Sequence, residues 1–157
     1  MRSNRFGRAR QVLADRGGNL MIEMAFALPL IALLLIGLLD LGRLSLQKSA
    51  VLQGARAGAQ YGMTAPDETS NINSTAQSAT GLSGVTATNS VFCECVSGTT
   101  VVCTTTCTGS QTLKKYITVN TTKPFSSVLG STTVNFGGFA LWTPPTSVSA
   151  SVTMIVP

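Results

Sequence analysis

The strongest pattern in the chain is an apolar run close to its N-terminus. Residues 24–39 contain no charged side chain, and the run reaches back to Asn19 if the single carboxylate of Glu23 is accepted within it. At ~1.5 Å of rise per residue, a helix over residues 19–39 spans the ~30 Å hydrocarbon core of a bilayer. The pattern therefore predicts a transmembrane helix at residues 19–39.

Charge asymmetry predicts the orientation of this helix. Residues 1–18 contain five arginines and one aspartate, whereas Arg43 and Lys48 follow the run. By the positive-inside rule, residues 1–18 form a basic cytoplasmic leader, and the chain after residue 39 lies outside the cytoplasm. An ordinary secretory signal peptide is the alternative, but no small-x-small cleavage site follows the run.

The helix is expected to continue beyond the membrane. Apolar residues recur at roughly helical intervals, which favours one helix from Asn19 to Tyr61 with an extracytoplasmic part at residues 40–63. Pro29 removes a backbone hydrogen bond and is expected to kink the helix.

Small residues form a stripe on the outer half of this helix. Gly54, Gly58 and Gly62 recur every four residues on one face. Because glycine is unfavourable in a helix interior, the stripe predicts close packing of another element, either the C-terminal sheet or a neighbouring subunit. The alternative is that these glycines only fray the end of the helix.

Residues 64–157 are expected to form a small extracytoplasmic domain. A short helix is predicted to open at Asp67 and Glu68 and to end at Gly81. The residues expected to face inward from this helix are Ile72, Ala76 and Ala79.

From residue 85 the apolar period changes to two, which predicts three strands. The positions that carry this period are Val85, Ala87, Val91, Cys93 and Cys95, then Ile117 and Val119, then Val148, Ala150, Val152, Met154 and Val156. Gly137-Gly138 and Pro144-Pro145 punctuate the approach to the last strand. The predicted fold class is α+β, with an antiparallel sheet of three or four strands packed against the long helix.

The sequence contains four cysteines, Cys93, Cys95, Cys103 and Cys107. In an oxidising extracytoplasmic compartment they are expected to form two disulfides. If residues 96–102 form a hairpin, nesting predicts Cys93 with Cys107 and Cys95 with Cys103, and the crossed pairing stays open. A four-thiolate zinc site and a redox-active pair are alternatives, but the CxxC spacing that both use is missing.

Composition argues against catalysis. Of the 157 residues 44% are hydrophobic and 11% are charged, and there is no histidine. The absence of histidine excludes His-dependent triads and His-ligated zinc. Asp67, Glu68 and Glu94 form no recognisable acid–base pair, so no enzyme activity, cofactor, metal or small-molecule substrate is expected. The net charge of +5 is concentrated in residues 1–18, so no nucleic-acid surface is expected either.

The junction between the leader and the apolar run resembles a prepilin processing site. Gly18 is followed by Asn19-Leu20-Met21-Ile22-Glu23, similar to type IV prepilins of the tight-adherence (Tad/Flp) class. The resemblance implies that a prepilin peptidase cuts between Gly18 and Asn19. It also places Glu23 at the fifth position of the mature chain, where it would neutralise the N-terminal ammonium of a neighbouring subunit.

Further motifs over residues 16–63 resemble the TadE-like minor pseudopilins. They are Glu23, Pro29, Gly37-Leu38-Leu39-Asp40-Leu41-Gly42-Arg43 and Gly54-Ala55-Arg56-Ala57-Gly58-Ala59-Gln60-Tyr61. Met24 departs from the pattern, since the family usually has Phe or Tyr after the glutamate. The resemblance implies a pilin-like assembly subunit of a bacterial adhesion pilus. Its implied partners are the inner membrane, prepilin peptidase, other pilin and pseudopilin subunits, and the assembly platform.

A second hypothesis assigns the protein to a different functional class. The chain is alternatively an uncleaved single-span inner-membrane protein whose periplasmic domain binds a ligand or a partner. Processing after Gly18 distinguishes the two hypotheses.

Overall fold

The computed structural model describes residues 16–96, 98–128, 130, 133–136 and 138–157. Residues 1–15, which carry most of the predicted leader, lie outside the described residues. The chain divides into two compact units, with the boundary in the sequence between Leu39 and Asp40. Helix α2 (Arg16–Thr64) belongs to the first unit as far as Leu39 and to the second from Asp40 onward.

The described part of the first unit is an apolar helical segment. From Leu20 to Leu39 most side chains are exposed, and Pro29 lies inside the helix. Among the described residues, one helical stretch, Leu20–Thr64, is long and apolar enough to cross a membrane, with a mean hydropathy of 2.5 in its most apolar window. A signal sequence shares this length and composition. The stretch is therefore a candidate membrane span.

The end of α2 and the following helix α3 (Thr69–Ala79) lie within the second unit. α2 extends three residues beyond the expected Tyr61 and ends just before Pro66, which disfavours helical backbone in the residue that precedes it. In α3, Ile72 and Ala76 are buried as expected. Ala79 is exposed, which corrects the prediction, because Thr80 takes the buried position instead.

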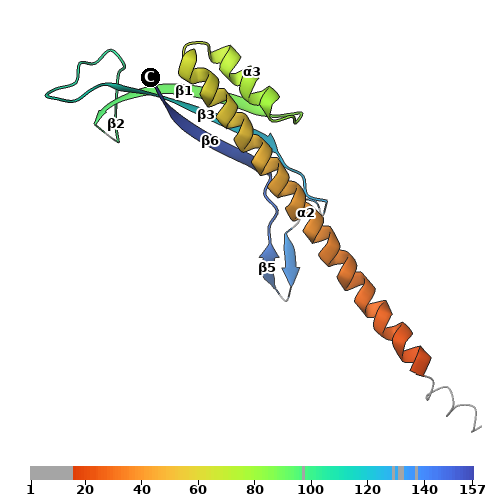
Figure 1. Ribbon diagram of the computed structural model, residues 1–157. Coiled ribbons are helices and arrows are strands. Elements are labelled where there is room, and N and C mark those ends of the chain that lie inside the picture. Colours follow the sequence, from red (N-terminus) through yellow and green to blue (C-terminus); the bar gives the residue numbers. More distant parts are fainter. Residues whose placement is uncertain (1–15, 97, 129, 131–132, 137) are drawn as a thin grey trace, which may run out of the picture. The chain divides into compact units, whose positions relative to one another are not determined.

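The sheet of the second unit is antiparallel with strand order β2-β1-β3-β6. Its strands are β1 (Thr86–Val96), β2 (Thr99–Val101), β3 (Lys114–Pro124) and β6 (Ser147–Val156). The long strands pair without interruption, from Thr86 opposite Thr122 and from Lys115 opposite Val156. An α+β fold with a small antiparallel sheet is thus confirmed, as Figure 1 shows.

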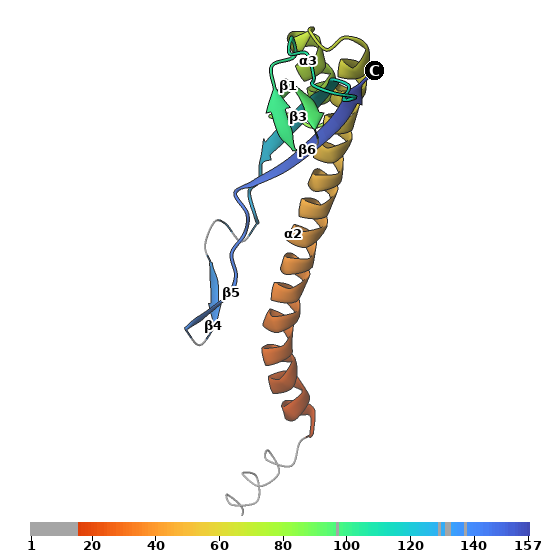
Figure 2. The ribbon, with the colours of Figure 1, turned by 90° about the vertical axis from the view of Figure 1, so that its left-hand side faces the viewer.

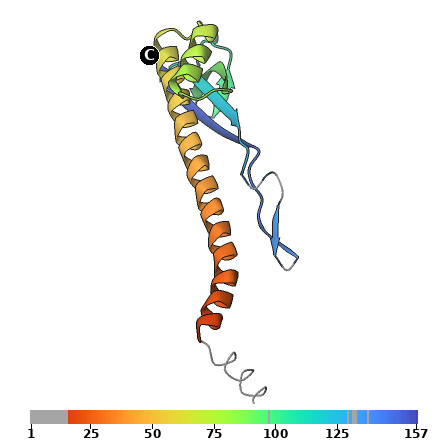
Figure 3. The same cartoon turned by 90° about the vertical axis from the view of Figure 1, so that its right-hand side faces the viewer.

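One face of the sheet forms the core. α3 and the part of α2 in the second unit cover the face that carries Ile117 and Val119 of β3, both fully buried (Figure 3). The other face is rich in hydroxyls, and Thr118 and Thr153 are hydrogen-bonded there at 2.8 Å across β3 and β6. The alternation follows from the two-residue period of a strand, which sends every second side chain to the helices.

A separate two-stranded ribbon joins β3 to β6. It consists of β4 (Val134–Phe136) and β5 (Phe139–Trp142), which pair with each other and not with the larger sheet (Figure 2). From the sequence, only the turn residues Gly137-Gly138 and Pro144-Pro145 were noted in this region, and no strand was predicted. Gly138 lies at the turn with a φ of 84°, a left-handed backbone conformation that favours glycine. This turn residue therefore belongs to a hairpin.

Candidate functional site

The predicted processing site lies at the beginning of α2. Gly18 and Asn19 are in helical backbone, and Glu23 follows one turn later with an exposed side chain. Glu23 is the only charged residue between Arg16 and Asp40. The segment therefore presents a single carboxylate on an apolar, exposed helix.

Asp40, the first residue after the apolar run, is almost completely buried at 1% exposure. The backbone N–H of Val128 donates to both of its carboxylate oxygens at 3.0 Å, and the hydroxyl of Ser127 donates to Oδ2. Arg43 lies one turn further along α2, with Nη1 3.9 Å from Oδ1. A buried carboxylate is costly without such partners, so Asp40 fixes the loop after β3 to the helix.

Asp40 belongs to the Gly37–Arg43 motif, but the sequence pattern assigned no role to its side chain. Its partners lie 87 and 88 residues away, where no local pattern reveals them. Only its position in the sequence indicates a role, because a carboxylate placed directly after an apolar run must find either water or hydrogen-bond donors.

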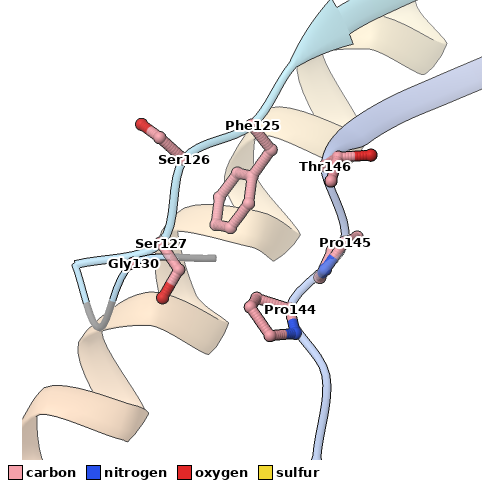
Figure 4. A pocket seen from close by; sticks show the side chains of 7 residues that line it. All are labelled: Phe125, Ser126, Ser127, Gly130, Pro144, Pro145 and Thr146. Carbon is pink, nitrogen blue, oxygen red and sulfur yellow. The ribbon is translucent and has the colours of Figure 1, made fainter. Parts of the chain in front are cut away.

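The loop held by Asp40 is the base of the β4–β5 ribbon. The N–H of Phe125 donates to the carbonyl of Thr146 at 2.9 Å and brings the two ends of the connection together. A cavity of about 240 Å³ lies beside this hydrogen bond and is lined in part by the same two residues. Figure 4 shows the ring of Phe125 and the ring of Pro144 directed into the space between the two chain segments. The base of the ribbon thus combines one backbone hydrogen bond with a small cavity of mixed lining.

The glycine stripe of α2 faces α3 and β3. A Cβ built on Gly58 would lie 2.7 Å from the Cβ of Ala76, 3.1 Å from Val119 Cγ1 and 3.2 Å from the carbonyl oxygen of Ile72. A Cβ on Gly54 would lie 2.5 Å from the carbonyl oxygen of Ala76, and one on Gly62 would meet Ile117 Cδ1. These distances leave no room for a side chain, so the stripe is the surface on which the domain packs.

A buried hydrogen bond fixes the sheet to the same helix. The hydroxyl of Thr121 donates to the carbonyl oxygen of Val51 at 2.8 Å, and both residues are fully buried. Because the oxygen of a helical carbonyl can accept a second hydrogen bond, α2 is not broken by this contact. Thr121 sets the height of β3 along α2.

The end of α2 is joined to the start of α3 by a small polar cluster. Tyr61 Oη donates to Glu68 Oε2 at 2.5 Å, and Asn71 Nδ2 donates to the same oxygen at 2.7 Å. The hydrogen bond from Tyr61, and then that from Asn71, lowers the pKa of Glu68 below its ordinary value. The hydrogen bond to Glu68 raises the pKa of Tyr61. Both shifts favour the pair of neutral phenol and ionised carboxylate.

The four cysteines form two crossed disulfides, Cys93–Cys103 and Cys95–Cys107, with Cα–Cα distances of 5.1 and 5.5 Å. The nested pairing expected from the sequence, Cys93 with Cys107 and Cys95 with Cys103, is therefore wrong. The physical reason is the register of the hairpin: Val96 pairs with Thr99, so Cys93 lies opposite Val101. The second pair of cysteines thus falls beyond the end of β2.

The two disulfides exclude the four-thiolate zinc site that was the alternative role of these cysteines. None of the four cysteines is free. Among the described residues, no group of three or more His, Cys, Asp or Glu side chains is placed to hold a metal ion. The disulfides attach the loop after β2 to β1, which makes this end of the domain a cross-linked tip.

The first part of the chain matches a known protein family. Residues 18–60 match the family model described as TadE-like protein. No curated protein and no solved structure matches the chain. The matched segment begins at Gly18 and includes Glu23, the apolar run, Asp40 and the first two glycines of the stripe. The resemblance inferred from the sequence is confirmed for residues 18–60, which are similar to TadE-like proteins.

Proposed function

We propose that the protein is a minor pseudopilin, a structural subunit of a Tad-type adhesion pilus. The observation that carries the proposal is the extent of the family match, which starts at Gly18 and continues through the apolar helix to residue 60. A match that begins at the proposed cleavage glycine fits a mature chain that starts at Asn19. TadE-like proteins are structural, and the proposed role is assembly and not catalysis.

In this proposal a prepilin peptidase removes residues 1–18 at the cytoplasmic face of the inner membrane. The leader carries most of the net positive charge, so its removal leaves a mature chain near neutrality. Residues 19–39 then hold the subunit in the membrane, residues 40–63 continue the helix, and residues 64–157 form the periplasmic domain. This orientation follows the positive-inside rule.

Glu23 has a specific part in the proposed assembly. Cleavage creates an ammonium group at Asn19 in an apolar setting, where an unpaired charge is expensive. The exposed carboxylate of Glu23 is the charge available on this segment to neutralise the ammonium of a neighbouring subunit. The pairing aligns the new subunit with the one before it. Its partners are other pilin and pseudopilin subunits and the assembly platform.

The experiment that tests the proposal is localisation of the tagged protein on sheared, purified pili. The wild-type chain is expected in the pilus fraction in its short, processed form. A Gly18→Val variant blocks processing and is expected to stay in the membrane fraction. A Glu23→Ala variant is expected to be processed and absent from pili, with Glu23→Gln as the variant that keeps shape but not charge.

The competing hypothesis predicts a different distribution. An uncleaved single-span protein with a periplasmic binding domain remains in the membrane fraction at full length, whether or not Gly18 is changed. Full-length protein confined to membranes contradicts the proposed function. Normal incorporation of the Glu23→Ala variant contradicts the pairing role alone.

A further inference from the structure

Strand β6 forms one edge of the four-stranded sheet. Its ten residues pair with β3 along their whole length, from Pro124 opposite Ser147 to Lys115 opposite Val156, without a shift in register. Among the described residues, no strand pairs with the other side of β6 (Figure 2). β6 therefore presents a long, uninterrupted backbone edge.

The outward backbone groups of β6 belong to its odd-numbered residues. The hydrogen bond from the N–H of Phe125 to the carbonyl oxygen of Thr146 lies directly beside the first pair of the β3–β6 ladder. Because bonded and non-bonded pairs alternate in an antiparallel ladder, the even-numbered residues of β6 bond to β3. The N–H and C=O groups of residues 147, 149, 151, 153 and 155 then point away from β3.

This edge lacks the features that usually prevent strand pairing. Natural edge strands are protected by charged side chains, proline, a bulge or a very short length. Residues 124–157 contain no Asp, Glu, Lys or Arg, and β6 itself contains no proline. By contrast, β2 at the opposite edge of the sheet has only three residues, and its register shifts between Glu94 and Val96. The edge of β6 is therefore open to a further strand.

The helix-facing side chains of β6 are also incompletely covered. Ile117 and Val119 of β3 are fully buried, but their partners in β6, Met154 and Val152, remain partly exposed. A neighbouring strand with an apolar side chain at every second position would bury Val152 and Met154, which is favourable because apolar surface leaves water. The side chains of β6 thus ask for an apolar partner on this face.

The direction of β6 decides between a second copy of β6 and a different strand. Along β3, Thr121 bonds to Val51 of α2, whereas Ile117 is the residue that a Cβ on Gly62 would meet. β3 therefore runs against the direction of α2, and β6, antiparallel to β3, runs with it. Two β6 strands paired antiparallel would place the residue-40 ends of their α2 helices at opposite ends of the joined sheet. Chains that emerge from one membrane after residue 39 have these ends on the same side, so this pairing does not suit them.

A parallel pair of β6 strands does not suit the side chains either. Two identical edges meet in parallel only if one sheet is turned over. Ser149, Ser151 and Thr153 of one copy would then lie beside the apolar row of the other. The partner that fits is an uncharged strand of a different chain, apolar at every second residue.

We propose that the outer edge of β6 is the docking site for one strand of a neighbouring subunit of the same pilus. The strand runs antiparallel to β6, contains no charged residue over the paired length and places apolar side chains beside Val152 and Met154. Its backbone bonds to the odd-numbered residues of β6, which gives affinity, while the alternate apolar contacts give specificity. The inference rests on the proposed function, because the partner is another subunit of the pilus.

Ser151→Pro tests the backbone contact, because it removes one outward N–H from the middle of the edge. Proline is tolerated in edge strands where the N–H faces solvent, so the bonds from β6 to β3 are expected to remain. Ser151→Thr is the matched control and keeps the N–H. Amide hydrogen exchange of both full-length variants in micelles checks that Val152 and Met154 stay protected.

Photo-crosslinking in purified pili identifies what lies on the edge. Benzoylphenylalanine is introduced in place of Ser149 on the edge, and in a second chain in place of Asn120 in β3, which has a paired strand on each side. Position 149 is expected to crosslink to one uncharged segment of another subunit, identified by mass spectrometry of the joined peptides, and position 120 to give little product. Ser151→Pro is expected to lower the yield from position 149 roughly tenfold, because it leaves a backbone acceptor of the partner strand without its donor. Ser151→Thr is expected to leave the yield unchanged.

The outcomes separate this inference from the proposed function. If the wild-type chain is in pili and Ser151→Pro crosslinks from position 149 as strongly as Ser151→Thr, the inference is overturned while the proposed function stands. No product from position 149, equal product from positions 149 and 120, or a product that joins two copies of this chain also overturns it. A wild-type chain absent from purified pili overturns the proposed function, and this inference with it.

Discussion

The backbone N–H of Val128 meets both carboxylate oxygens of Asp40 at 3.0 Å, across 88 positions of the sequence. This contact joins the first residue after the apolar run to the loop that follows β3. It is buried at Asp40, where a charge-assisted hydrogen bond is worth more than at the surface. One side chain of α2 therefore holds the loop after β3 through hydrogen bonds.

Removal of the Asp40 carboxylate should destabilise the second unit. An Asp40→Ala variant leaves the N–H of Val128 without its acceptor, and hydrogen bonds to charged groups contribute about 1.5–3 kcal/mol each. We expect the free energy of unfolding to fall by about 2 kcal/mol or more, measured by denaturant titration of the full chain in micelles.

Asp67→Ala is the matched control for this variant. The Asp67 side chain is 94% exposed and lies 3.6 Å from Lys115. An exposed ion pair of this kind contributes about 0–1 kcal/mol, so the control should unfold nearly like the wild type. Equal stabilities of the Asp40 and Asp67 variants would show that the buried carboxylate does not hold the loop.

Replacement by alanine should destabilise the protein at Gly58 of α2 and not at Gly42. A methyl group on Gly58 meets Ala76 Cβ at 2.7 Å, whereas one on Gly42 meets nothing within 4 Å. Overpacking costs about 1–3 kcal/mol, and replacing a helical glycine gains up to about 1 kcal/mol. We expect Gly58→Ala to lower the melting temperature and Gly42→Ala to raise it or leave it unchanged. A higher melting temperature for Gly58→Ala would mean that the helix and the domain are not in close contact.

The crossed disulfides predict distinct outcomes for two double variants. Serine at both Cys93 and Cys103 removes one complete bond and leaves no free thiol, at a cost of roughly 2–3 kcal/mol for a loop of this length. Serine at Cys93 and Cys107 breaks both bonds and leaves two thiols. Thiol labelling under denaturing conditions, followed by mass spectrometry of tryptic peptides, distinguishes them. The reverse result would restore the nested pairing.

Stability should depend on pH through Tyr61 and Glu68. The pKa of Glu68 is lowered from 4.5, so its contribution is present above 4.5 and is lost as pH falls through the lower folded value. The pKa of Tyr61 is raised from 10.0, so its contribution is present below 10.0 and is lost as pH rises through the higher folded value. Tyr61→Phe should therefore be less stable than wild type between these limits and converge with it outside them.

Unfolding curves of the wild type and Tyr61→Phe across pH test this prediction. Tyr116→Phe is the control, because its hydroxyl is not the one that is hydrogen-bonded to Glu68. A constant difference between wild type and Tyr61→Phe at every pH would assign the effect to packing and not to ionisation. An NMR titration of the Glu68 side chain should show its pKa rising when Tyr61 is replaced.

Local patterns were sufficient to predict the helices and the three long strands. The apolar run, the four-residue glycine spacing and the two-residue period around Ile117 and Val119 each report a repeat of the backbone itself. They also indicated the α+β class, because a helix with one smooth face and strands with one apolar face must cover each other.

What the sequence did not predict depends on register and on distant contacts. The disulfide pairing follows from the position of a tight turn: Val96 pairs with Thr99, so Cys103 and Cys107 lie beyond β2 and not opposite Cys95 and Cys93 as nesting requires. The partner of Asp40 lies 88 residues away. The β4–β5 ribbon is built from short strands around Gly137-Gly138, and segments of this length carry too little periodicity to separate a hairpin from a loop.

If residues 1–18 are a leader that a prepilin peptidase removes, the mass of the intact protein will reveal it. The chain is expressed with and without the peptidase, purified from membranes and measured by mass spectrometry, with Gly18→Val as the control for the cleavage site. We expect a mature chain that begins at Asn19 only when the peptidase is present and Gly18 is intact. A chain that still begins at Met1, or one cut after the apolar run, would contradict it.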